Sequence, residues 1–156
     1  MKKQVKSFLC AVRGIFSAIG TESHLRFHLV AAFYVIFFAL LGEFDPSQWA
    51  ILSVTIGTVI FAELVNTALE DLCDLYTKEY NEKIKRIKDV AAGAVFVTAI
   101  ASVFVAVCLF ILTGNICVIF SKLWSNPLWF IPLGASAVLS LLFLFLPGIK
   151  NKKDKE

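Results

Sequence analysis

The chain has 156 residues, of which 58% are hydrophobic and 17% are charged, and its mean hydropathy is +0.78. Soluble domains are roughly 45–50% apolar and about 25% charged, so this composition argues against an ordinary soluble domain, and the low charge excludes a disordered chain. The net charge of +3 is too small to indicate nucleic acid as a partner. The cysteines lack CxxC or Cys/His metal spacing, and we interpret them as packing thiols: Cys10, Cys73, Cys108 and Cys117.

The first segment, residues 3–21, has the pattern of an amphipathic helix. Its apolar side chains recur at spacings of three and four, opposite Lys3, Lys6 and Arg13. Arg13 interrupts any signal-peptide core, and no small-residue cleavage site follows. We expect this helix to lie on the cytoplasmic face of a membrane. A cytoplasmic helix packed on other protein is the alternative.

Four apolar stretches follow, and each is compatible with a membrane span. They cover residues 25–42, 49–72, 89–113 and 128–148, and a span needs about 20 mostly apolar residues. All four should be helical because lipid offers no partner to backbone polar groups. A polar loop at residues 76–89 joins the second and third, and a connection at residues 114–127 joins the third and fourth. The predicted fold class is an all-α integral membrane protein, with a surface helix and a bundle of transmembrane helices.

The basic residues predict how these spans cross the membrane. Cytoplasmic loops carry an excess of Lys and Arg. With four spans and a cytoplasmic N-terminus, 14 of the 15 Lys and Arg residues lie on the cytoplasmic side, and only Lys122 lies outside. A chain with three spans would place the basic tail, residues 149–156, outside. The pattern therefore predicts that both termini are cytoplasmic and that the tail attracts anionic lipid.

The second span carries polar side chains at a depth where lipid disfavours them. Glu63, Asn66, Glu70 and Asp74 lie at helical spacing, and the three carboxylates fall within about 40° of one another around the helix. A carboxylate at bilayer depth costs at least a few kcal/mol, so such residues normally face a bundle interior, a partner or an ion pathway. The alternative interpretation is that these groups only form hydrogen bonds between helices.

Residues from two other segments can reach the cytoplasmic end of this acidic stripe. Glu22 lies between the surface helix and the first span, and Lys88 and Asp89 lie where the polar loop enters the third span. Several carboxylates with one lysine, beside a lysine-rich loop, suit Mg²⁺ and a polyphosphate, because Mg²⁺ takes a few carboxylates and leaves room for phosphate oxygens.

Other cofactor sites find less support in the sequence. The two histidines, His24 and His28, are four residues apart and could form part of a zinc site, but no third ligand is evident. We interpret them as side chains that extend to the membrane interface. The chain has no Walker loop and no GxGxxG motif, which excludes the P-loop and protein-kinase folds.

The residues around this stripe match a known family. The segment AELVNTALEDLCDL (Ala62–Leu75), followed by KDVAAGAV (Lys88–Val95), closely resembles the bacterial membrane-embedded diacylglycerol kinase and undecaprenol kinase family. The N-terminal segments FLCAVRGI (Phe8–Ile15) and TESHLRFHLVAA (Thr21–Ala32) resemble it too. The resemblance covers residues 3–113 in the family's order and spacing.

The resemblance implies a surface helix, three spans and a homotrimer with composite active sites between subunits. It also implies close helix approach at Ala91–Ala94. The roles that it implies are a catalytic base for Glu63, support of the catalytic centre for Asn66, binding of metal and ATP for Glu22 and Glu70, nucleotide contacts for Lys88 and Asp89, and a loop contact to the nucleotide for Glu79.

The chain departs from the family pattern in two ways. His28 occupies a position that is acidic in the diacylglycerol-using enzymes, and it resembles the undecaprenol-using Gram-positive branch. The chain also continues past the usual family end near Thr113 into a fourth span and a basic tail. This additional helix must fit outside the trimer, and it leaves the motif residues unchanged.

The sequence thus predicts an ATP- and Mg²⁺-dependent lipid kinase in a bacterial inner membrane. It would transfer the γ-phosphate of ATP to the hydroxyl of undecaprenol or diacylglycerol at the cytoplasmic face, with undecaprenol favoured. One alternative is a small ion-coupled transporter that uses Glu63 as its ion site, although such a site should lie near the midplane. A second alternative is a non-catalytic membrane assembly protein.

Overall fold

A computed structural model describes residues 2–145 of the chain. The end of the predicted fourth span and the whole predicted basic tail, residues 149–156, lie outside the described residues. Within them, helices are the sole regular elements, in this order: α1 (Lys2–Thr21), α2 (Ser23–Leu41), α3 (Pro46–Tyr76), α4 (Glu82–Ala106), the π-helix η1 (Val107–Leu112), α5 (Asn115–Ser125), the 3₁₀ turn η2 (Pro127–Trp129) and α6 (Phe130–Leu144).

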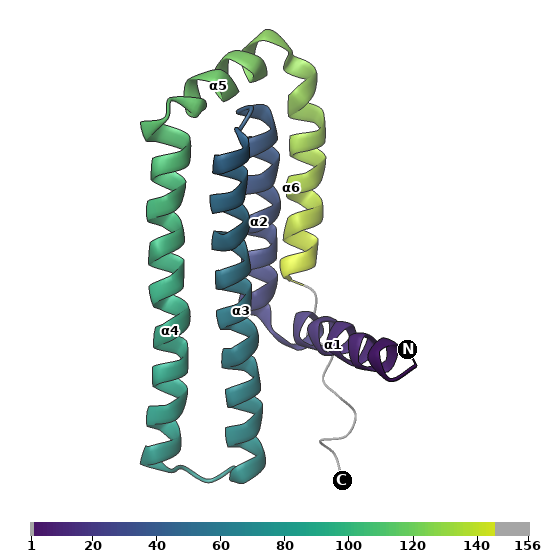
Figure 1. The fold of residues 1–156 in the computed structure, drawn as a ribbon, viewed down its shortest axis with the longest axis vertical. Coiled ribbons are helices and arrows are strands. Elements are labelled where there is room, and N and C mark those ends of the chain that lie inside the picture. The colour runs from purple at the N-terminus through teal and green to yellow at the C-terminus, as the bar shows by residue number, and fades with distance from the viewer. Residues whose placement is uncertain (1, 146–156) are drawn as a thin grey trace.

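The predicted all-α membrane fold is confirmed. In the described part of the chain, four helical segments are long and apolar enough to cross a membrane, namely Ser23–Leu41, Pro46–Tyr76, Glu82–Leu112 and Pro127–Leu144. Figure 1 shows α3 and α4 as a long antiparallel pair, with α2 beside α3 and α6 beside α2. Helix α5 crosses one end of this bundle, and α1 projects sideways from the opposite end of α2.

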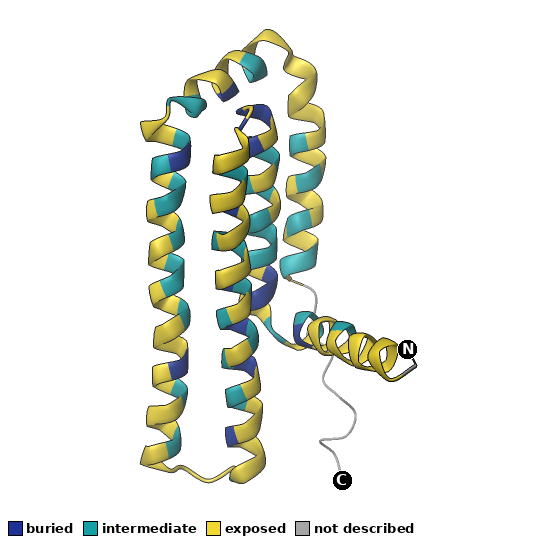
Figure 2. Ribbon diagram, in the orientation of Figure 1, coloured by how far each residue is buried: buried dark blue, intermediate teal, exposed yellow. Residues whose placement is uncertain are grey.

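Helix α1 keeps its apolar side chains on the outside of the molecule. Val5, Phe8, Leu9 and Phe16 are all exposed, and almost the whole helix is yellow in Figure 2. An exposed apolar face on a helix that lies across the bundle is the arrangement of a helix that enters the membrane interface in its plane. The apolar face that the sequence predicts for this helix is therefore available to contact lipid.

Both long helices begin at well-formed caps. At the start of α3, Asp45 Oδ1 accepts hydrogen bonds from the backbone N–H of Ser47 (2.7 Å) and of Gln48 (3.0 Å), and Gln48 Oε1 accepts one from Asp45 N (2.9 Å). This reciprocal capping box satisfies N–H groups that lack helical partners. At the start of α4, Asn81 Oδ1 accepts from the N–H of Lys83 at 3.0 Å.

The cap at Asn81 corrects the length of the predicted polar loop. We expected a loop over residues 76–89, but α3 ends at Tyr76 and α4 already begins at Glu82. The charged residues that suggested a loop form the first two turns of α4, where their side chains can remain in water. Helix α4 therefore begins before the apolar segment that marks the third span.

A small buried cluster holds α2, α3 and α4 together near the α2–α3 turn. Ala39, Phe44, Leu52 and Leu109 are its buried members, and the rings of Phe44 and Phe110 lie 4.8 Å apart between centroids. Most other large apolar side chains are exposed, and exposed residues, in yellow, occur along every helix in Figure 2. In lipid, association between helices depends on close packing and hydrogen bonds rather than on escape from water. Such a core can therefore remain small.

Helix α5 was not anticipated within the connection at residues 114–127. It follows Gly114, whose φ of 79° lies in the left-handed region that favours glycine, and it buries Ile119. Lys122 Nζ lies 2.6 Å from Glu43 Oε1 in the α2–α3 turn. The hydrogen bond from Lys122 lowers the pKa of Glu43. The helix is thereby attached to the turn that it covers.

Helix α6 is attached to α2 through hydroxyl groups. The Tyr34 hydroxyl lies 3.3 Å from Ser140 Oγ and 3.4 Å from Ser136 Oγ. None of the residues of α6 is buried, and Figure 2 shows it in yellow and teal. Because the hydroxyls are surrounded by apolar side chains, the hydrogen bonds between them determine where α6 packs on α2.

Tyr34→Phe should weaken the attachment of α6. It removes both hydroxyl contacts and keeps the ring, and hydrogen bonds of this kind contribute about 0.5–1.5 kcal/mol. Thermal unfolding in detergent should show a lower midpoint than for the wild type. Tyr76→Phe is the matched control, because Tyr76 is an exposed tyrosine at the end of α3. Equal midpoints for the two variants would contradict this role of Tyr34.

Candidate functional site

Glu63 is a buried carboxylate in the middle of α3. Its exposed fraction is 3%, and its Oε1 lies 3.0 Å from Nε2 of His28 on α2. We expected His28 to extend to the membrane interface, and this interpretation is wrong, because its side chain is only 20% exposed and contacts Glu63. The position of His28 in the sequence of α2 did not indicate that it contacts another helix.

Asn66 and Glu70 form a second polar group on α3. Asn66 Nδ2 donates a hydrogen bond to Glu70 Oε1 at 2.8 Å. The Asn66 Oδ1 atom is buried and has no hydrogen-bond partner among residues 2–145. Asn66 lies about 60° around the helix from Glu63. The predicted stripe therefore consists of Glu63 against α2 and an Asn66–Glu70 pair beside it.

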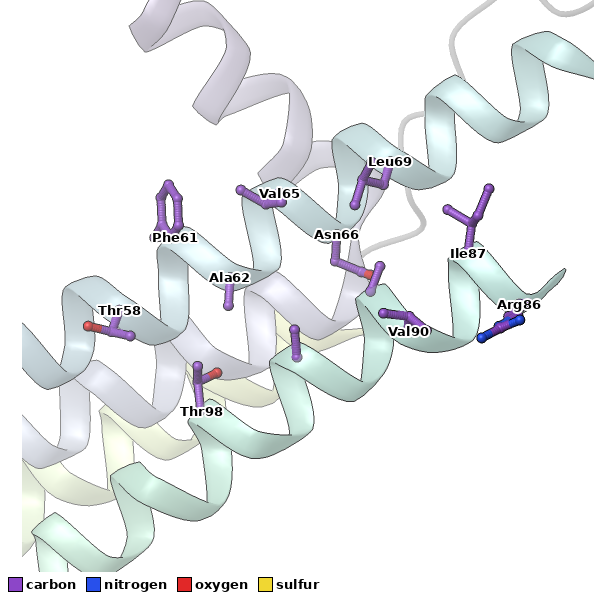
Figure 3. Close-up of a pocket in the computed structure, with 12 residues that line it drawn as sticks. Thr58, Phe61, Ala62, Val65, Asn66, Leu69, Arg86, Ile87, Val90 and Thr98 are labelled. Atoms are coloured by element: carbon purple, nitrogen blue, oxygen red, sulfur yellow. The ribbon is translucent and has the colours of Figure 1, made fainter. Parts of the chain in front are cut away.

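Asn66 points into a groove between α3 and α4, which Figure 3 shows. The groove has a volume of about 590 Å³. Asn66 and Arg86 are near one end and Thr58 and Thr98 near the other, with apolar side chains between them. Its full lining is Thr58, Phe61, Ala62, Val65, Asn66, Leu69, Arg86, Ile87, Val90, Ala91, Ala94 and Thr98.

Lys88 on α4 forms an ion pair with a residue of α3. Its Nζ lies 2.5 Å from Asp74 Oδ1 of α3, so the pair joins the two helices close to their connection. Asp89, the next residue, is exposed and lines a polar hollow of about 400 Å³. The hollow is lined by Tyr80, Glu82, Lys83, Lys85, Arg86 and Asp89. Glu79 is exposed in the short loop next to it.

Glu22 lies at the corner between α1 and α2. It is the N-cap residue of α2, but its side chain makes no capping hydrogen bond. The corner is held by Arg26, which is 5% exposed and whose Nη1 donates to the carbonyl oxygens of Ile19 (3.1 Å) and Gly20 (3.3 Å) at the end of α1. A cation at the C-terminal carbonyls of a helix is favourable. The sequence analysis gave no role to Arg26.

A single chain does not assemble the expected cluster of carboxylates. Across residues 2–145, the structure contains no group of three or more His, Cys, Asp or Glu side chains that could hold a metal ion. The expectation that carboxylates from three segments meet is therefore wrong for one chain. The zinc alternative likewise has no third ligand in this part of the chain, and His24 is exposed. The carboxylates lie apart, since Glu63 contacts His28 of α2, Asp74 contacts Lys88 of α4, and Glu22 lies at the corner between α1 and α2.

Comparison of the sequence with known proteins identifies the family of this chain. A sequence model described as prokaryotic diacylglycerol kinase matches residues 9–110. The undecaprenol kinase of Bacillus subtilis is 39% identical over 106 residues, which are 68% of this chain and 86% of that protein. The chain belongs to the prokaryotic diacylglycerol kinase family.

A second relative is also a kinase of a lipid. The diacylglycerol kinase of Synechocystis is 40% identical over 104 residues, which are 66% of this chain and 59% of that protein. No solved structure is significantly similar to the chain. Membership in the family makes this protein a lipid kinase, a phosphotransferase with an alcohol acceptor that uses a nucleotide co-substrate.

Asp74→Asn should loosen the α3–α4 hairpin by a small amount. The side chains of Asp74 and Lys88 are 66% and 34% exposed, and exposed ion pairs contribute about 0–1 kcal/mol. We expect a slightly lower unfolding midpoint, with a difference that shrinks at high salt. Asp71→Asn, at an exposed position one turn earlier, is the control. A larger loss for Asp71→Asn would contradict the importance of the pair.

Proposed function

We propose that this lipid kinase transfers the γ-phosphate of ATP to the hydroxyl of a long-chain lipid alcohol, with Mg²⁺ as cofactor. Undecaprenol is the favoured acceptor, because His28 resembles the undecaprenol-using branch and because the relative with 86% coverage is named undecaprenol kinase. Diacylglycerol is the second candidate, on the strength of the Synechocystis relative. The observation that carries the proposal is the buried carboxylate of Glu63 within a span, since a charge at that depth marks a functional site.

Glu63 acts as the general base. Its carboxylate is buried next to apolar helices, where a lipid can approach sideways from the bilayer. During transfer, the lipid hydroxyl gives its proton to Glu63 while its oxygen bonds to the γ-phosphorus and the bond to the β–γ bridging oxygen breaks, so that ADP leaves. Positioning and charge neutralisation supply most of the catalysis in such reactions. Asn66 supports this centre through its bond to Glu70.

Glu22 and Glu70 have the right chemistry for a magnesium ion. Mg²⁺ prefers one or two carboxylates together with phosphate oxygens. Glu22 is half-buried, and its carboxylate does not form a capping hydrogen bond with α2. Glu70 is also half-buried and accepts one hydrogen bond at Oε1. When bound, the ion would neutralise phosphate charge, and these two residues would hold it.

In this proposal, three residues contact the nucleotide: Lys88, Asp89 and Glu79. The polar hollow that Asp89 lines carries three basic side chains, Lys83, Lys85 and Arg86, which suit the negative charge of a triphosphate. Lys88 would exchange its contact with Asp74 for a phosphate oxygen. Its exposed fraction of 34% leaves its ammonium group accessible.

The location follows from the basic residues. Helix α1 and the α3–α4 loop lie at one end of the bundle, and the α2–α3 turn and α5 lie toward the other (Figure 1). The first end carries the basic residues of α1 and of the start of α4, so it faces the cytoplasm of a bacterial inner membrane. The nucleotide and the catalytic groups then lie on the same side, with both termini cytoplasmic.

The active enzyme is a homotrimer with sites shared between subunits. Residues 9–110 match the family, whereas one chain leaves its metal ligands unassembled. At Gly93 on α4, an added Cβ would meet nothing within 4 Å. The small residues from Ala91 to Ala94 are therefore mostly left unpacked within the chain, apart from buried Ala91, and can accept a neighbouring helix. Helix α6 lies outside this assembly.

The two carboxylates of α3 should separate the chemical step from nucleotide binding. Glu63→Gln should abolish transfer of labelled phosphate to either lipid and leave binding of Mg-ATP nearly unchanged, because a base acts on the lipid proton. Glu70→Gln should weaken Mg-ATP binding itself. Nucleotide titrations and lipid phosphorylation on purified protein measure both effects. Equal losses of nucleotide binding in the two variants would show that these roles are wrongly assigned.

Mixed oligomers should reveal shared sites. Glu63→Gln and Glu22→Gln subunits are each expected to be inactive alone. If Glu22 of one subunit completes the site of its neighbour, a 1:1 mixture exchanged in detergent should regain about a quarter of the wild-type activity, because random assembly restores some sites. Activity that stays absent in verified mixed oligomers would indicate a self-contained site in each chain.

A further inference from the structure

The contact between His28 and Glu63 joins two different helices at a buried position. Nε2 of His28 on α2 lies 3.0 Å from Oε1 of Glu63 on α3. Among residues 2–145, no other side chain forms a hydrogen bond or ion pair with this carboxylate. The backbone of Glu63 is contacted by a different side chain, since Thr67 Oγ1 donates to its carbonyl oxygen at 3.0 Å.

His28 also stands at an apolar crevice. A crevice of about 200 Å³ lies between α2, α3 and α4. Its lining is apolar except for His28, Thr55 and Ser102. The hydroxyl of Thr55 is already used, since it donates to the carbonyl of Ile51 at 2.8 Å, and that of Ser102 donates to Ala99 O at 2.8 Å. His28 is therefore the polar group of this crevice whose hydrogen bond reaches another helix.

We propose that His28 is a positioning residue for the catalytic carboxylate. Its Nε2–H donates to Glu63 Oε1, which fixes the plane of the carboxylate and leaves Oε2 as the oxygen that receives the lipid proton. This inference rests on the proposed function, since it requires Glu63 to act as the base. His28 does not touch the lipid or the nucleotide in this role.

The burial of Glu63 makes a hydrogen bond to its carboxylate important. A carboxylate removed from water is costly unless it accepts a hydrogen bond, and one without a donor can also rotate freely. A base works only when its lone pair lies within hydrogen-bond reach of the proton it takes, and a misplacement of 1 Å can lower a rate by about 100-fold. A single donor on a neighbouring helix satisfies one oxygen and directs the other.

The proton inventory is simple. The lipid hydroxyl loses its proton to Oε2 of Glu63, its oxygen forms the bond to the γ-phosphorus, and the leaving oxygen remains with ADP. His28 keeps its own Nε2 proton throughout, so it neither gains nor loses charge in the step. Its contribution is thus geometric, and it can be replaced by another N–H donor of the same reach.

Two amide substitutions test the inference. In His28→Gln the side-chain nitrogen lies near the position of Nε2, whereas in His28→Asn it falls short, and both variants keep a polar side chain at this site. We expect His28→Gln to retain kcat for lipid phosphorylation within about threefold and His28→Asn to lower it about 10- to 100-fold. The KM for the nucleotide should stay unchanged in both. His24→Gln and His24→Asn, at the exposed histidine one turn earlier, are matched controls expected to behave like the wild type.

The same assay separates this inference from the proposed function. If the wild-type protein phosphorylates neither undecaprenol nor diacylglycerol, the proposed function fails and the inference fails with it. If the wild type is active and Glu63→Gln is inactive, but His28→Gln and His28→Asn have equal kcat values, only the positioning role is wrong.

Discussion

A carboxylate inside a membrane span must have a partner, and the contact of Glu63 with His28 supplies it. The cost of an isolated charge at that depth is at least a few kcal/mol, so this contact fixes α2 against α3 and sets the rotation of α3 about its own axis. Once Glu63 faces α2, Asn66 faces the groove with α4. The position of the other polar groups of α3 depends on this one constraint.

This rotation distributes the polar groups over two sides of α3. Glu63 contacts α2, whereas Asn66 lines the groove with α4 and donates to Glu70, and Asp74 reaches Lys88 at the water-facing end. Glu22 belongs to yet another corner, which Arg26 holds in place. Across residues 2–145, a single chain therefore brings no three His, Cys, Asp or Glu side chains together as a metal site. In the homotrimer that we propose, a second copy would complete the site.

The membrane explains why the fold is held in a different way at its ends and in its middle. Within the apolar spans, buried small residues such as Ala39 and Ala91 let helices approach, and packing replaces the hydrophobic effect. At the ends, water is present, and charged contacts such as Glu43–Lys122 attach α5 to the turn below it. Helix α6 depends on Tyr34 and two serines, which is consistent with an addition to a family core that the match places at residues 9–110.

The sequence by itself determined the helices, their membrane character and the family, because lipid imposes a local pattern of about 20 apolar residues per span and because the E-x-x-N-T-A-x-E motif of Glu63–Glu70 is specific. It did not reveal helix α5 or the true start of α4, since exposed charges mark the end of the membrane rather than the end of a helix. It also did not indicate that His28 contacts Glu63 or that Arg26 binds a carbonyl oxygen at the end of α1. Only the tertiary structure decided these contacts, because whether two side chains on different helices meet depends on how the helices rotate and cross, and that is a property of the packed bundle rather than of either helix alone.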